Sequence, residues 1–180
     1  MFCNCPGTVP AFPSSGCNTE TRTGGIKRVI FAACDLVFTD ITDTAEWTTH
    51  ITADKVHATG EVKGSKPKAS FTKKKLFSCH PEEVTGATRQ IQIQDPNADN
   101  TNFADYTFWN TIQAEHRNFL VGYTDCDDIF YGWIPDFTIE LDDVRDDDVE
   151  GATVFDVTIA WSSLTMTVPQ SIPGLNAVLA

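Results

Sequence analysis

The chain has 180 residues, 41% of them hydrophobic, and a formal net charge of −12 at pH 7. This length and apolar content predict one folded domain with a substantial core, and they exclude global disorder. The negative charge argues against general affinity for nucleic acid or for an anionic membrane surface, because both would repel the chain. The start lacks the basic and apolar regions of a secretory signal, so we expect synthesis in the cytoplasm.

Both ends of the chain are rich in residues that interrupt regular structure. Residues 1–25 contain three prolines and four glycines, and residues 169–180 contain Pro169, Pro173 and Gly174. Few backbone hydrogen bonds can form in such segments. We therefore expect an extended N-terminal arm at 1–25, a β-rich core domain at 26–168 and a C-terminal arm at 169–180.

The first regular elements are a strand and a short helix. The run KRVIFAACDLVF at 27–38 is rich in β-branched and aromatic residues and predicts a buried strand, with Cys34 as a small core residue. In the next segment Asp43 can cap a short helix, and Glu46 stands three positions later as its capping-box partner.

A basic segment follows. Six of the chain's 13 Lys and Arg residues are concentrated there, and no acidic residue lies between Glu61 and Glu82. Apolar side chains are too sparse to bury this segment. Residues 55–77 therefore predict two strands around a projecting basic hairpin or loop. The six residues are Lys63, Lys66, Lys68, Lys73, Lys74 and Lys75.

The next two elements have clear periodicities. TRQIQIQD at 88–95 alternates, which predicts a strand with Ile91 and Ile93 inward and its glutamines outward. Residues 105–117 have apolar side chains at three- and four-residue steps and predict the principal helix. His116 shares its apolar face, which favours a packed residue over a catalytic base.

The remaining chain predicts strands. Segments 119–124 and 129–144 are joined by a turn, Pro135 interrupts the second, and 153–168 follows. Short strands at regular spacing indicate a mainly β fold, an antiparallel sandwich or barrel.

Acidic residues dominate the second half. Sixteen lie between Asp95 and Asp156, against only Arg117 and Arg145. The loop DDVRDDDVEG lacks the ligand spacing of an EF-hand, so we interpret it as a solvated loop. Its charge complements the basic segment and predicts a heterologous contact between copies. Besides the six lysines, the expected assembly contacts are Asp142, Asp143, Asp146, Asp147 and Asp148.

No catalytic, cofactor-binding or metal site is predicted, because HExxH, GxSxG, Walker and GxGxxG motifs are absent. An acidic-cleft hydrolase, nucleic-acid binding by the basic segment and a carbohydrate-binding module remain alternatives. The module would use Trp109, Trp133 and Trp161, which are better explained as core. Zinc ligation is a further alternative to free thiols, although the spacing is not CxxC. Its ligands would be Cys3, Cys5, Cys17, Cys79 and His80.

The order of these elements resembles that of bacteriophage virion proteins, most of all tail-tube subunits. The matching pieces are 1–25, 27–38, 55–77, 105–117 and 119–168. The resemblance implies a non-enzymatic β-sandwich without cofactors that joins copies of itself into a hexameric ring or tube in the virion. It implies contacts with other virion proteins and an acidic lumen through which DNA passes without specific binding. A capsid decoration protein or a head–tail connector is the alternative within this class.

Overall fold

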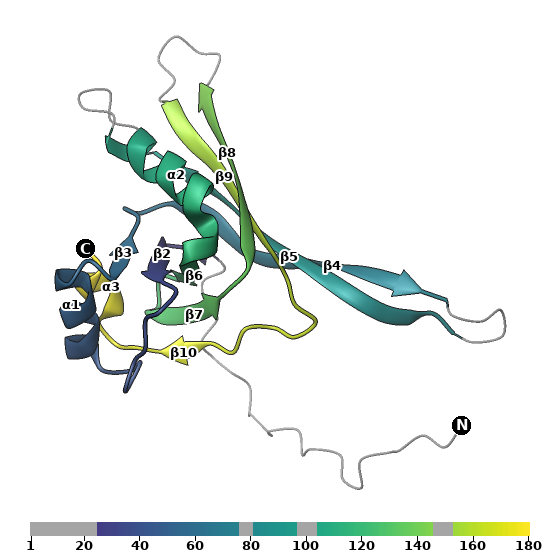
Figure 1. Cartoon of the computed structure of the whole chain (residues 1–180), viewed down its shortest axis with the longest axis horizontal. Helices are drawn as coiled ribbons and strands as arrows, with labels where there is room; N and C mark the ends of the chain where they lie inside the picture. Colours follow the sequence, from purple (N-terminus) through teal and green to yellow (C-terminus); the bar gives the residue numbers. More distant parts are fainter. Residues whose placement is uncertain (1–24, 76–80, 97–103, 146–152) are drawn as a thin grey trace, which may run out of the picture.

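Two antiparallel five-stranded sheets form the body of the molecule, a computed structural model that describes residues 25–75, 81–96, 104–145 and 153–180 (Figure 1). The hairpin sheet has the order β1–β4–β5–β9–β8, and the inner sheet has the order β10–β7–β6–β2–β3. This confirms the mainly β sandwich, whereas the described sheets are not closed into a barrel. The strands are β1 Gly25–Ile26, β2 Arg28–Ala33, β3 Val56–Ala58, β4 Lys63–Lys74, β5 Glu83–Asp95, β6 Phe119–Thr124, β7 Ile129–Ile134, β8 Phe137–Arg145, β9 Thr153–Ser162 and β10 Gln170–Ser171.

The inner sheet is buried on both faces. Val29 and Phe31 of β2 pack toward the hairpin sheet, whereas Ile30 and Ala32 pack into a second cluster around Trp47. Because both sets are apolar, β2 has a continuous hydrophobic run rather than an alternating one. The hairpin sheet packs only one face on the core.

Helices cover an end and the far side of the sandwich. Helix α2, Ala104–Glu115, buries Trp109 and Ile112 and confirms the helix expected at 105–117. His116 begins a short 3₁₀ helix, and its ring lies 6.1 Å from that of Phe137. Helices α1, Thr44–Thr52, and α3, Leu175–Val178, supply the second cluster. In the described ranges no helix is both long and apolar enough to cross a membrane.

The cap of α1 differs in one respect from the expectation. Asp43 Oδ1 accepts a hydrogen bond from Ala45 N at 2.9 Å, as an N-cap does. The Glu46 carboxylate instead accepts from the N–H groups of Thr39 and Asp40, at 2.7 and 2.8 Å. It therefore secures the loop before the helix rather than closing a capping box.

The projecting hairpin is longer than expected and lies at other residues. Only β3 lies in the first part of the 55–77 segment, and it belongs to the inner sheet. The basic residues expected in a loop form strand β4, which pairs with β5 in a hairpin that extends away from the body (Figure 1). The part of this hairpin that extends beyond β9, residues 71–75 and 83–87, is called the hairpin arm, or simply the arm. Pro67 falls at a register shift in β4, where a missing N–H is tolerated.

The interruption expected at Pro135 is confirmed, because β7 lies in the inner sheet and β8 in the hairpin sheet. Two further expectations are wrong. The C-terminal segment is not an extended arm. It forms β10 and α3, and it buries Ile172, Leu175 and Leu179 in the core. Cys34 follows the end of β2 and is exposed rather than a core residue.

Candidate assembly surface

The uncovered face of the hairpin sheet carries polar side chains in rows that run across the strands. Paired residues place Lys63, Gln94, Asp156 and Asp142 in one row, from β4 through β5 and β9 to β8. Directly opposed residues of a sheet share a face, so each row is a continuous line of side chains. A second row contains Ser65, Gln92, Thr158 and Glu140, and a third contains Lys68, Gln90, Ala160 and Thr138.

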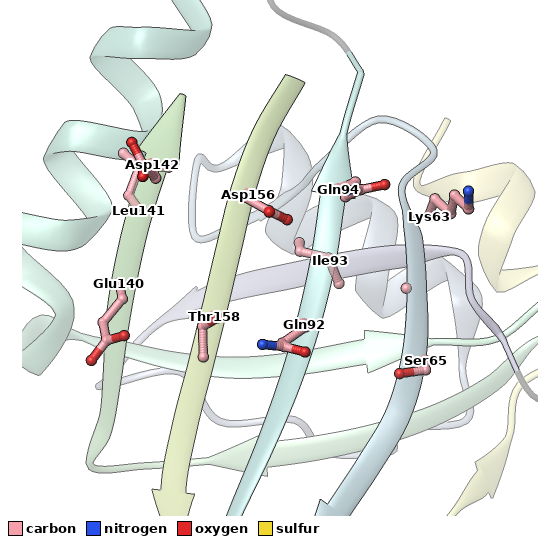
Figure 2. A pocket seen from close by; sticks show the side chains of 11 residues that line it. Lys63, Ser65, Gln92, Ile93, Gln94, Glu140, Leu141, Asp142, Asp156 and Thr158 are labelled. Carbon is pink, nitrogen blue, oxygen red and sulfur yellow. The ribbon is translucent and has the colours of Figure 1, made fainter. Parts of the chain in front are cut away.

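These rows border a broad open groove of about 770 Å³ (Figure 2). Figure 2 shows the Glu140, Asp142 and Asp156 side chains on β8 and β9, with the glutamines of β5 between them and Lys63. The sheet therefore presents a hydrophilic face instead of a second apolar one. The outward glutamines of 88–95 are confirmed by this arrangement.

Charge is separated across this face. The acids stand on β8 and β9, and Lys63 and Lys68 stand on β4 near the opposite side. Asp142 and Asp156 are direct cross-strand partners. Like charges in that position destabilise a sheet, so a cation from elsewhere would relieve a standing repulsion.

Both sides of this sheet end in strands with unpaired outer edges in the described chain. Strand β8 pairs only with β9, and β4 beyond Ser65 pairs only with β5. Unpaired edges offer backbone donors and acceptors to another chain. The acidic edge and the basic edge of the sheet therefore both lack a strand partner in the described chain, while α2 packs against β8 through Tyr106 and Asp143.

The six lysines predicted as contacts divide between the two faces of β4 and its continuation. Lys63, Lys68 and Lys74 lie on the polar face, because each opposes a residue of that face or continues its alternation. Lys73 lies on the other face with Phe71, and Lys75 follows the end of the strand. All five are exposed.

Lys66 has partners within its own chain. Its ammonium lies 2.9 Å from Asp125 Oδ2 and 3.0 Å from the Tyr131 hydroxyl, and 5.0 Å from the centre of the Tyr131 ring. Asp125 is completely buried. This pair joins the root of the hairpin to the β6–β7 turn, so Lys66 fixes the direction of β4.

Asp125 also organises the turn. Its Oδ1 accepts hydrogen bonds from the N–H groups of Asp127 and Ile129, both at 3.0 Å. Its backbone carbonyl accepts from Asn176 Nδ2 at 2.9 Å. One buried carboxylate residue thus connects the hairpin, the turn and α3. The sequence indicated a turn here, but nothing in the pattern TDCDD pointed to Lys66.

The acidic residues predicted as assembly contacts do not share one face of the sheet. Asp142 is on the polar face, whereas Asp143 is on the opposite side of β8 and accepts a hydrogen bond from the Tyr106 hydroxyl at 3.0 Å. Asp146, Asp147 and Asp148 lie outside the described residues. Sequence reasoning missed Asp156 and the glutamine rows, although the alternation of 88–95 had placed the glutamines outward.

The described ranges supply no cluster of metal ligands. No group of three His, Cys, Asp or Glu side chains there could hold a metal ion. The zinc ligands considered from the sequence, Cys3, Cys5, Cys17, Cys79 and His80, all lie outside the described residues. Trp109 and Trp161 are buried in the core between the sheets, and Trp133 packs against the second cluster.

Two titratable side chains, those of Lys66 and Tyr123, should make the fold less stable at alkaline pH. Burial would lower the pKa of Lys66, but its hydrogen bonds and charge attraction with Tyr131 and Asp125 raise that pKa overall. Burial raises the pKa of the Tyr123 hydroxyl. The folded chain holds both protons more tightly, so this stability is complete below the unfolded values of about 10 and is lost as pH rises above them.

Urea unfolding between about pH 8 and pH 11 should therefore show a falling free energy of unfolding above about pH 10. The Tyr123→Phe variant removes one of the two groups and should show a shallower fall. Identical pH profiles for this variant and the wild type would contradict the assignment to Tyr123.

Comparisons of the chain with protein families, with curated proteins and with solved structures found no match.

Proposed function

We propose that this protein is a non-enzymatic structural subunit that assembles with copies of itself through the two edges of its hairpin sheet. The observation that carries the proposal is the charge separation across one polar face, with acids at β8 and lysines at β4. An acidic edge that meets a basic edge of another copy makes a heterologous contact, which closes into a ring or continues as a filament.

This contact between sheet edges, called the sheet-edge contact, would also account for the like charges of Asp142 and Asp156, which face each other within one subunit. Joining β8 of one copy to the β4 side of the next would bring lysines toward Glu140 and Asp142. Opposite charges at such an edge fix the register and speed association, whereas the backbone edges supply hydrogen bonds. Rows of polar side chains would then continue from subunit to subunit.

Among assemblies of this kind, the tail tube of a bacteriophage fits best. In a ring joined through these edges, the polar face would form one continuous wall. If that wall faces a lumen, its carboxylates repel DNA phosphates, and its glutamines add no charge. DNA would pass without specific binding. The proposed location is the virion, with other virion proteins as further partners.

Assembly of the purified protein tests the proposal. We expect rings or tubes in electron micrographs and large species in sedimentation velocity at low ionic strength. Raising the salt from about 0.05 M to about 0.5 M should dissociate them, because the charges at the edges are screened. A strict monomer at high concentration, with and without other virion components, contradicts the proposal. Immunogold labelling of particles separates a tail tube from a decoration protein or a connector.

A further inference from the structure

Most of the large hydrophobic side chains exposed on the described surface lie on the arm or in the segment that leaves the sheet beside it. Six such residues are exposed, and five of them lie on the arm or in the segment that follows β9. These five are Phe71 at 53%, Val84 at 47%, Leu164 at 59%, Met166 at 76% and Val168 at 77% exposure. The sixth, Val37, lies apart in the loop before α1. Monomeric proteins rarely expose several large apolar residues together without a partner.

Two of the five belong to the face of the arm that continues the core face of the sheet. Phe71 opposes Ala87, and Ala87 shares its face with buried Ile91. Val84 opposes Lys73, which is two residues from Phe71, so Val84 lies on that face as well. Within the body this face is covered by the inner sheet. The arm extends past that cover (Figure 1).

The other three belong to residues 164–168, which leave the sheet at the same place. Ser163 N donates to the carbonyl of Ala87 at 2.9 Å, and Ala87 is the residue opposite Phe71. The segment therefore begins beside the root of the arm, as Figure 1 also shows for the chain between β9 and β10. Leu164, Met166 and Val168 stand at alternate positions, and no described residue accepts a hydrogen bond from the backbone N–H groups of 164–168.

We infer that these five residues, called the root patch here, are a second self-association surface that packs on the body of another copy. The charges favour a second copy over an unrelated protein. The arm beside the patch carries Lys73, Lys74 and Lys75. Outside 63–75 the chain has all 25 of its acidic residues and only seven of its 13 basic ones. The body of a second copy is thus acidic and would attract these lysines. The root patch would bury its apolar surface against that body.

This inference rests on the proposed function but uses a different part of the molecule. The sheet-edge contact involves the polar face and the outer strands, whereas the root patch is formed by the core face of the arm and by the segment that follows β9. A subunit with one heterologous contact makes a ring or a single filament. A second, independent contact allows rings to stack, which is what a tube requires.

The two contacts differ in their response to salt, which makes them separable by experiment. Apolar burial is not screened by salt, whereas the charged edges are. In about 1 M NaCl, wild-type protein should therefore retain a smaller oligomer held by the root patch. The double variant Met166→Asp, Val168→Asp should be a monomer in that salt, with self-association weakened at least about tenfold.

Val37→Asp is the matched control, since Val37 is 79% exposed and lies outside the patch. Sedimentation velocity across a concentration series should show it unchanged. Circular dichroism should show both variants folded, because all three positions are exposed. Phe71→Ser provides a second variant, on the arm rather than on the segment after β9, and should weaken association in the same direction.

The possible results separate failure of this inference from failure of the proposed function. If wild type assembles and both patch variants match it at high salt, the inference is overturned while the proposed function stands. If wild type is a monomer in every salt, the proposed function and the inference both fail. If Val37→Asp weakens association as much as the patch variants do, added negative charge is the cause and the inference is overturned.

Discussion

Replacing Asp125 by alanine should lower the free energy of unfolding by about 3–5 kcal/mol. The carboxylate is completely buried and lies 2.9 Å from the Lys66 ammonium, whose side chain is 27% exposed. Its removal leaves that cation without its charged partner. The N–H groups of Asp127 and Ile129 also lose their acceptor, at 3.0 Å in each case. Breaking one member of such a pair is costly even where the intact pair adds little net stability.

Urea unfolding at pH 7, followed by circular dichroism, measures this loss. Lys68→Met is the control, because Lys68 lies two residues from Lys66 but is exposed on the polar face, and the change should stay within about 0.5 kcal/mol. Lys66→Met should be clearly destabilising, since it leaves the Asp125 carboxylate buried without its cation. If Asp125→Ala costs no more than Lys68→Met, the pair does not hold the hairpin on the body.

The sequence predicted an element correctly where only one face of the strand or helix packs on the core. Ile91 and Ile93 alternate with exposed glutamines, and α2 buries Trp109 and Ile112 at a helical spacing. In each case the period of the apolar residues is the period of the backbone. These local signals are independent of which other elements cover the buried face.

The sequence could not show which sheet each strand would join. Pro135 indicated a break, but β7 and β8 differ because one is covered on both faces and the other on one face only. The fold of the C-terminal segment likewise depends on contacts that are distant in sequence. Its prolines suggested an arm, yet the N–H groups of Gly174 and Asn176 donate to the Asp128 carboxylate at 3.0 and 2.9 Å. These contacts are 46 and 48 residues apart in sequence, so no local pattern contains them.

The basic segment shows how pairing can override local preference. Apolar side chains are sparse in 63–75, and lysine and glycine have low strand propensity, so the segment resembled a loop. A thirteen-residue partner, β5, supplies the pairing that these residues do not favour alone. Strand geometry then sends Lys68 and Lys73 to opposite faces and pairs Lys66 with Asp125. A charge cluster in sequence is therefore not a charge cluster in space, because the strand register decides which lysines belong to the candidate assembly surface.

Reversing the charge at either edge of the hairpin sheet should abolish assembly into rings or tubes. One variant carries Glu140→Lys and Asp142→Lys, so its β8 edge becomes basic; the other carries Lys63→Glu and Lys68→Glu, so its β4 side becomes acidic. Each would bring like charges together at every contact, which costs several kcal/mol for closely placed groups. These side chains are exposed, so both variants should stay folded. Sedimentation velocity at low salt should show neither rings nor tubes, and only the smaller oligomer held by the root patch.

Mixing the two variants in equal amounts should restore assembly, because the basic β8 edge of one then meets the acidic β4 side of the other. The remaining contact, an unmodified acidic β8 with an unmodified basic β4, is the wild-type one. A ring of alternating variants closes only with an even number of subunits, so the mixture also tests the hexameric symmetry. The quadruple variant should assemble alone, since its two edges are again complementary. Assembly by each double variant alone would show that other residues hold the subunits together, whereas failure of the mixture to assemble would show that these edges do not face each other.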